Sequence, residues 1–399
     1  NGTTAPVATL ASDFIINNAS RLTVRAAGTL DCPGAFAVDG STTTNGAFTL
    51  QSGATLAIGS PNGISTFGNT SGNIRAGNTL ANRDFNAAGN YAYKGTANQT
   101  TGTGLPSTIT GQLTIANTGS SGSNTVTLTT NNTTLATLNL QSGLFAAGTG
   151  QNINLPSGGV INDTGGDFAT GATAGRITIL SGNAAFNGTS NPYEVYTSGG
   201  INFGAQTVTI QNGGTFRINS GGFVNTNAPF YGTGSTLQYW IGNASYGRSL
   251  EWSASSGRGY PHHVQISNNT TLDPANTAGS QANTPLRTAG NLTIDSGSAM
   301  YMDFGGNSMN EDLVVGGAMV LSGALSGSQA SGSDIFVGGN WQNDGTSANF
   351  FPNNRAVFLN GTGTQTISGT NVSFPAFPFL LIDKTAGSVI LLRDVEVSE

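Results

Sequence analysis

Aromatic and basic side chains gather in one stretch of this sequence, residues 230–263, which contains seven of its aromatic residues. Exposed aromatic rings next to hydrogen-bonding groups suit stacking against sugars or contact with another protein. We therefore expect a ligand-binding surface here, formed by Tyr231, Tyr239, Trp240, Tyr246, Arg248, Trp252, Arg258 and Tyr260. The alternative is that these rings cover the side of the fold or fill its core.

Paired carboxylates could act as general acid and base, as in polysaccharide-degrading enzymes. The 19 acidic residues are scattered, and the tightest groups are Glu311 with Asp312 and Asp394 with Glu396. Adjacent side chains on a strand point to opposite faces, so the first two should diverge, whereas the second two should share a face. We expect all four to be solvated surface charges and the protein not to be an enzyme.

This chain has few residues that could bind a metal or a cofactor. His262 and His263 are its two histidines, Cys32 is its single cysteine, and no acidic residue stands beside the histidines at ligand spacing. Neighbouring positions on a strand would also turn the two imidazoles apart. We expect no cofactor and no metal, and we expect Asn343-Asp344-Gly345 to form a turn, although the sequence leaves calcium binding open.

The composition excludes several classes of protein. Charged residues make up 8% of the chain and 59 of 399 residues are Gly, against averages of about 25% and about 7%. Coiled coils, collagen and disulfide scaffolds do not fit this composition, and a net charge of −6 without a basic cluster argues against nucleic-acid binding. No stretch approaches the ~18 apolar residues of a membrane helix. The patterned apolar residues, 37% of the chain, argue against disorder.

One six-residue pattern recurs and indicates how these side chains are positioned. It reads FTLQSG (48–53), LNLQSG (138–143), ITILSG (177–182), VTIQNG (208–213), LTIDSG (292–297) and AMVLSG (318–323). Alternating residues followed by Ser-Gly or Asn-Gly predict a short strand and a turn, and a second strand usually follows.

The repeats favour an all-β fold, a parallel β-solenoid (β-helix) with irregular coil lengths and inserted loops. A sandwich or barrel rarely exceeds ~250 residues, whereas solenoid coils contact only their neighbours. We expect roughly 22 residues per coil and about 18 coils, with Asn and Thr side chains stacked in ladders at the turns. The handedness stays open. Residues 1–399 should form one continuous segment of a longer chain, with a loop-rich aromatic insertion at 230–263. Thr42-Thr43-Thr44 and Thr125, Thr127 and Thr129 are too irregularly spaced for an ice-binding plane.

Two stretches resemble a known group of proteins. The first combines GGNWQNDG (338–345), FLNGTGTQTISGT (358–370) and LLIDKTAGSVILLRDVEV (380–397). The second combines FYGTGSTLQYW (230–240) and SYGRSLEWSASSGRGYPHHVQISNNTTLD (245–273). Both resemble repeat blocks of very large secreted and cell-surface, adhesin-like proteins of Bacteroidota, which are exported by type IX secretion. EDLVVGGAMVLSG (311–323) more weakly resembles autotransporter passenger β-helices. The resemblance implies an extracellular, β-rich surface protein and does not point to a catalytic residue.

These observations predict a non-enzymatic, extracellular adhesin-like solenoid at the bacterial cell surface, which projects binding loops or builds a fibre. Its partners would be a glycan or protein ligand, end-to-end or parent-chain solenoid contacts and the secretion machinery, without nucleic acid or membrane insertion. Two alternatives remain: a polysaccharide-binding or polysaccharide-degrading β-helix, and a self-polymerising fibre subunit.

Overall fold

A computed structural model of the chain describes residues 5–17, 20–40, 46–65, 71–75, 83–275, 281–345, 348–371 and 376–397. It is all-β, with parallel strands stacked in about 15 turns that form a β-solenoid. The predicted fold class is therefore confirmed. Two compact units divide the chain: Asn1–Glu194 with Gly204–Val208, and Val195–Phe203 with Thr209–Glu399. Among the described residues, no helix is long and apolar enough to cross a membrane.

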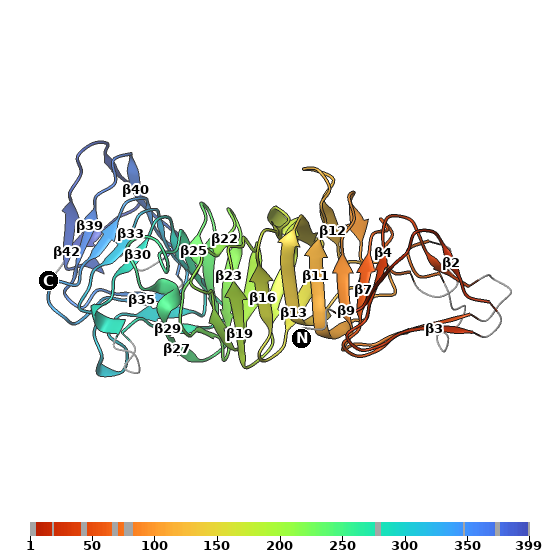
Figure 1. Cartoon of the computed structure of the whole chain (residues 1–399). Helices are drawn as coiled ribbons and strands as arrows, with labels where there is room; N and C mark the ends of the chain where they lie inside the picture. The colour runs from red at the N-terminus through yellow and green to blue at the C-terminus, as the bar shows by residue number, and fades with distance from the viewer. Residues whose placement is uncertain are drawn as a thin grey trace. The chain divides into compact units, whose positions relative to one another are not determined.

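The first unit is organised around one parallel sheet, in which β7, β9, β11 and β13 lie side by side (Figure 1). Its strands are β1 (Val7–Thr9), β4 (Thr29–Cys32), β7 (Thr55–Ile58), β9 (Asn90–Tyr93), β11 (Thr108–Ala116), β13 (Thr133–Ser142), β15 (Asn152–Leu155), β16 (Val160–Asp163), β18 (Arg176–Ile179) and β19 (Asn183–Asn187). Smaller sheets are formed by β2 (Phe14–Ile15) and β5 (Val38–Asp39), by β3 (Arg21–Val24), β6 (Ala47–Leu50) and β8 (Arg83–Phe85), and by β10 (Gln99–Thr100), β12 (Thr125–Thr127), β14 (Leu144–Ala146) and β17 (Asp167–Phe168). A short 3-10 helix, η2 (Gly171–Ala174), follows β17.

Three larger sheets make up most of the second unit, and the chain visits them in turn. The first contains β23 (Thr215–Asn219), β26 (Thr236–Trp240), β28 (His263–Ile266), β31 (Leu292–Ile294), β34 (Met319–Leu321), β37 (Trp341–Asn343), β40 (Gln365–Ser368) and β43 (Val389–Leu391). The second contains β27 (Ser245–Gly247), β29 (Thr271–Asp273), β32 (Ala299–Tyr301), β35 (Ala324–Ser326) and β38 (Phe350–Phe351). The third contains β30 (Leu286–Thr288), β33 (Leu313–Val315), β36 (Ile335–Val337), β39 (Ala356–Leu359) and β42 (Phe379–Ile382). From β28 to β40 each coil therefore presents three faces.

The remaining elements of this unit are short. They are β20 (Glu194–Thr197), which begins one residue before the unit, β21 (Gly200–Asn202) with β24 (Phe223–Val224), β22 (Thr209–Ile210) with β25 (Phe230–Tyr231), β41 (Ala376–Phe377) with β44 (Glu396–Val397), and the 3-10 helices η3 (Leu250–Trp252), η4 (Gln281–Asn283) and η5 (Phe304–Gly306).

The repeated pattern forms the corners of the coils. In each of the six copies the second predicted strand is present, and in five the Gly has a positive φ, between 66° and 80°. In five copies the two strands belong to different sheets, as with β31 and β32. The turn therefore redirects the chain from one face to the next, and the pairing is parallel between coils.

The core is a narrow stack of apolar side chains from equivalent positions of successive coils. In the first unit Leu56, Tyr91, Leu113 and Leu138 are in register, and all four are fully buried. In the second unit the same arrangement places Leu237, Val264, Leu292, Met319 and Trp341 in one column. Burial of these side chains stabilises the coil at roughly 1.5–3 kcal/mol per large apolar residue.

The coils differ in length, as predicted, because the register pairs Thr215 with Thr236 in a short coil but Thr55 with Asn90 in a much longer one. The predicted average coil length is wrong, because the coils are longer on average than roughly 22 residues. The chain therefore makes about 15 turns, fewer than predicted. Amide bonds between coils occur at turns, as predicted, where Asn269 donates to Asn243 at 3.1 Å. They also join strand positions of successive coils, where Asn187 donates to Asn162 and Asn162 to Asn139, each at 2.9 Å.

Among the described residues, a second amide motif is found in both units. Gln99 of GTANQT (95–100) and Gln365 of GTGTQT (361–366) each accept the N–H of the motif's Gly at 2.8 Å. Each side-chain amide also donates to two carbonyls of the preceding coil, Ile58 and Ser60 in one case and Val337 and Gly339 in the other. Both Gln side chains are buried. Each one therefore supplies hydrogen-bond partners for backbone groups that would otherwise be left unpaired inside the protein.

Candidate ligand-binding surface

Residues 230–263 contribute to several elements and do not form a separate insertion loop. The stretch contains β25, β26, β27 and η3 and enters β28 at His263. The register pairs Thr236 with His263, so the stretch forms little more than one coil of the solenoid. Its aromatic residues therefore alternate between the core and the surface according to their strand positions.

Three of the eight predicted binding residues are buried, and a fourth has its hydroxyl turned inward. Tyr239 is in register with Ile218 and Ile266 in the core column, and its exposed fraction is 0%. Trp252 is equally buried, with its indole Nε1 donating to the Arg287 carbonyl at 2.7 Å. Arg248 is 1% exposed. Tyr231 is half-buried, but its hydroxyl donates inward to the Glu251 carbonyl at 2.9 Å.

Arg248 ties together the segments that pack around it. Its guanidinium donates to the carbonyls of Pro274 and Pro285 at 2.9 Å, to those of Gln281 and Thr284 at 2.7 Å, to the Thr284 hydroxyl at 2.6 Å and to the Trp252 carbonyl. Burial lowers the pKa of Arg248 to about 10, so the side chain stays charged at neutral pH. Its position indicates a structural role.

Glu251 is the buried acid of this stretch. Its Oε1 accepts the Ser249 N–H at 2.8 Å and the Tyr239 hydroxyl at 3.2 Å, and its side chain is 0% exposed. Burial raises the pKa of this carboxyl above its usual range. The carboxylate in turn adds to the burial that raises the pKa of Tyr239 and of Tyr246. An acid sealed beneath tyrosine rings cannot reach a polymeric substrate at the surface.

The remaining predicted residues lie nearer to solvent. Trp240 follows Tyr239 on β26 and therefore points outward, with an exposed fraction of 37%. Tyr246, Arg258 and Tyr260 are half-buried. The Arg258 guanidinium lies 4.9 Å from the Phe230 ring centre and donates to the Ala228 carbonyl at 2.8 Å.

Trp240 belongs to a larger surface feature that spacing along the chain does not reveal. The guanidinium carbon of Arg217 lies 4.6 Å from the Trp240 ring centre and 4.0 Å from the Tyr196 ring centre, so the cation is held between two rings. Such cation–π contacts favour a fixed, flat arrangement of the three side chains.

A chain of hydrogen bonds extends from this stack across successive coils. Arg217 Nε donates to Gln238 at 2.6 Å, Gln238 donates to Gln265 at 3.1 Å, and Gln265 donates to the Asp295 carboxylate at 2.8 Å. These side chains alternate along their strands with core residues. Arg217, Gln265 and Asp295 are half-buried, whereas Gln238, which joins them, is 8% exposed. We call this set the outer strip; it consists of Tyr196, Arg217, Gln238, Trp240, Gln265 and Asp295.

The outer strip combines the two features that bind sugars. Ring faces can stack on the C–H face of a pyranose, and planar amide and carboxylate groups can pair with adjacent hydroxyls. Only Trp240 of this strip was predicted. Aligning TFRIN (215–219) with TLQYW (236–240) would have placed Arg217 beside Gln238 and Asn219 beside Trp240.

The other candidate groups have structural contacts. The Asp312 carboxylate accepts the Asp334 N–H at 2.9 Å, and Asp334 accepts the Ala356 N–H at the same distance. Glu311 is half-buried, and both Asp394 and Glu396 are exposed. At the predicted turn Asn343 ends strand β37, and its Oδ1 accepts the Gly345 N–H at 3.1 Å.

The prediction that His262 and His263 diverge is wrong. Their ring centres lie 4.5 Å apart in an edge-to-face arrangement, because His262 precedes strand β28 and escapes the alternation of the strand. His263 Nδ1 accepts the Asn291 N–H at 2.9 Å. In the part of the chain that the structure describes, no three His, Cys, Asp or Glu side chains form a group that could hold a metal. Thr42-Thr43-Thr44 lies outside that part, and Thr125 and Thr127 are on β12.

Comparison of the chain with protein-family models, with curated proteins and with solved structures found no match.

Proposed function

We propose that this chain is a non-enzymatic, adhesin-like β-solenoid of a bacterial surface protein and that it binds neutral glycan chains along the outer strip. The observation that carries the proposal is the Tyr196–Arg217–Trp240 stack, continued by the amide and carboxylate groups of the next coils. The strip crosses several strands, so a sugar chain lying on it would meet a new side chain at each coil, about every 4.8 Å.

The extracellular location rests on the resemblance of residues 230–273 and 338–397 to repeats of secreted Bacteroidota proteins and on the low charge of the surface. The absence of a catalytic role is supported by the contacts of the acids. Glu251 is sealed in the core, Asp312 is bonded to the next coil, and Asp295 accepts bonds from Gln265 and Ser267.

Glycan binding can be tested with the full chain. Retardation in native gels containing neutral polysaccharides identifies a ligand, and Trp240→Ala should then weaken binding about tenfold or more, the loss typical of a central aromatic contact. Arg217→Ala should act in the same direction, because it removes the support of both rings. Phe36→Ala is the matched control, since Phe36 is a comparably exposed ring, 40% exposed, outside the strip.

Two results would count against the proposal. Equal retardation of the wild-type chain and Trp240→Ala would show that the strip is not the binding surface. Release of reducing ends from a retained polysaccharide would show a degrading enzyme instead of a binding protein.

A further inference from the structure

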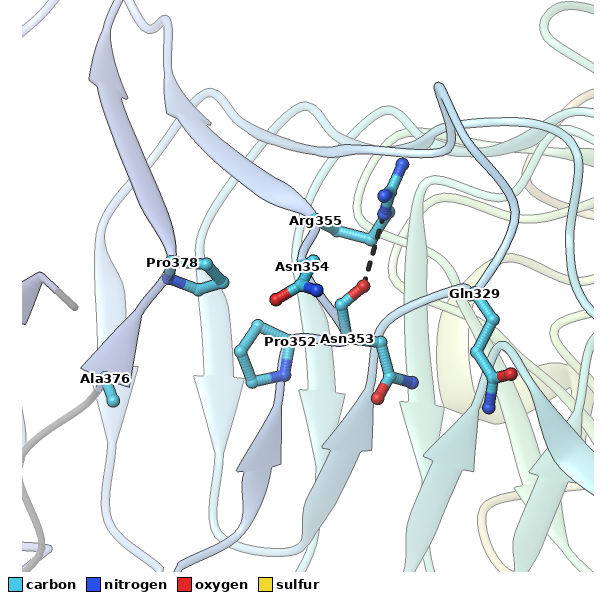
Figure 2. Close-up of a pocket in the computed structure, with 7 residues that line it drawn as sticks. All are labelled: Gln329, Pro352, Asn353, Asn354, Arg355, Ala376 and Pro378. Carbon is cyan, nitrogen blue, oxygen red and sulfur yellow. Dashed lines mark hydrogen bonds between the residues drawn. The ribbon is translucent and has the colours of Figure 1, made fainter. Parts of the chain in front are cut away.

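A pocket of about 540 Å³ lies in the second unit and shares no residue with the outer strip. It is lined by Gln329, Pro352, Asn353, Asn354, Arg355, Ala376 and Pro378. Its volume is within the range of small-molecule sites, about 300–1,000 Å³. Figure 2 shows the proline rings on one side and the Gln329 amide on the other, with the Arg355 side chain extending away from the turn that carries it.

The pocket is built on a tight turn between β38 and β39. Asn353 and Asn354 both have left-handed φ angles, 53° and 57°, and the Arg355 N–H donates to the Pro352 carbonyl at 3.0 Å. Two consecutive left-handed residues that are not Gly are unfavourable unless the surroundings fix them. The turn also needs Gly at position 327, where a Cβ would lie 2.5 Å from the Pro352 carbonyl oxygen.

A set of hydrogen bonds holds the base of this turn. Asn353 Nδ2 donates to the Asp303 carboxylate and to the Gly327 carbonyl at 2.8 Å, and to the Ser326 hydroxyl at 3.0 Å. Gln329 donates to the same Asp303 oxygen at 3.1 Å. The Asp303 carboxylate therefore fixes the side chains of Asn353 and Gln329, as a supporting group in a preorganised site does.

The other two polar side chains of the lining, Arg355 and Asn354, do not take part in the hydrogen bonds that hold the turn. The hydrogen bond that the structure gives to Arg355 joins Nε to the Asn353 carbonyl at 3.4 Å, and neither Nη1 nor Nη2 bonds to any described residue. The Asn354 amide likewise makes no side-chain bond to the described part of the chain, and Asn354 is exposed. The pocket thus offers a guanidinium fork that no described residue engages and an amide, beside two apolar proline rings.

We propose that this pocket binds an anionic sugar residue, with its carboxylate or sulfate on the Arg355 fork, its hydroxyls on Asn354 and the Gln329 carbonyl, and its C–H face on Pro352 and Pro378. A guanidinium binds such oxyanions through two parallel hydrogen bonds, which a single ammonium cannot reproduce. The proposal rests on the proposed function in that the ligand is a glycan, but it uses a separate set of residues and a different class of sugar.

Calorimetric titration of the full chain with three trisaccharides tests this assignment: a uronate, its neutral methyl ester and a sulfated galactan fragment. We expect the wild-type chain to bind the uronate, the sulfated probe or both, with the anionic probe favoured over the neutral ester. Arg355→Gln should lower that affinity about tenfold or more, Arg355→Lys by less, and Trp240→Ala should leave it unchanged. Thermal unfolding should be unaltered in Arg355→Gln, because the hydrogen bond that joins this side chain to the described part of the chain is long, 3.4 Å.

Several outcomes would overturn the assignment. One is the absence of binding to either anionic probe at millimolar concentration, and another is equal affinity of Arg355→Gln and the wild-type chain. Loss of uronate binding in Trp240→Ala alone would place the acidic sugar on the outer strip and refute the pocket. If the chain binds the uronate but does not bind the neutral polysaccharides, the proposal that glycans bind to the outer strip would be refuted and the proposal for the pocket would remain supported.

Discussion

Arg248→Met should strongly destabilise the second unit. Arg248 donates to four backbone carbonyls around residues 274–285, to the Thr284 hydroxyl and to the Trp252 carbonyl, and it is 1% exposed. Methionine fills a similar volume but donates no bond. Each buried acceptor left without a partner costs about 1–3 kcal/mol.

The expected loss follows from these contacts. Some of the acceptors can relax toward water, so the loss should resemble that of a broken buried charge network, about 3–5 kcal/mol, rather than the sum over all acceptors. For a unit of this size, each kcal/mol shifts the melting temperature by about 2–4 °C. We therefore expect melting of the second unit to fall on the order of 10 °C. In Arg248→Lys the melting temperature should fall by less, because the lysine ammonium can still donate to three acceptors at most.

The assay can separate the two units. Trp240, Trp252 and Trp341 all belong to the second unit, so tryptophan fluorescence reports its unfolding. Cys32 is fully buried in the first unit, and burial raises its pKa to about 12, so thiol labelling reports that unit. A melting temperature of Arg248→Met within about 2 °C of the wild-type value would refute the network argument, because that shift corresponds to no more than one kcal/mol. An equal shift in Cys32 labelling would show that the effect is not confined to the second unit.

Two further predictions concern buried carboxyls and pH. Burial raises the pKa of Asp163 from 3.8 to about 6, so the folded first unit holds this proton more tightly than the unfolded chain and its stability falls as the pH rises from about 4 to about 6. Asp163→Asn should abolish this pH-dependent loss of stability, which is on the order of 1–2 kcal/mol. The measurement is Cys32 labelling in denaturant at pH 4 and pH 7 with a pyridyl disulfide, a reagent that reacts with thiols at both pH values; an unchanged pH profile would contradict the assignment. The pKa of Glu251 is raised by burial in the same direction, so Glu251→Gln should stabilise the second unit at pH 7 and have little effect below pH 4.5, measured by tryptophan fluorescence in urea. A destabilised variant at pH 7 would mean that the carboxylate is needed in its charged form.

Local features of the sequence determined the fold class. Alternation of apolar residues and a Gly with positive φ act within one short repeat, so FTLQSG or LTIDSG specifies a strand and a corner wherever it occurs. Low charge and many short strands then favour coils that contact only their neighbours. The aromatic block was also visible as a concentration of residue types, and Trp240 within it lies at the surface as expected.

The length of each coil decides which side chains are buried and which residues they contact, and this could not be predicted from the sequence. Each side chain packs against positions one coil away, and the register pairs Thr215 with Thr236 but Thr236 with His263, so consecutive coils differ in length. This variable offset brings Arg217 between Tyr196 and Trp240, directs Tyr239 into the core and surrounds Arg248 with carbonyls of residues 274–285. The same offset places Asp303 beneath the turn at 352–355. Side-chain type is a local property, whereas burial and partners depend on the coil that the loop lengths bring alongside.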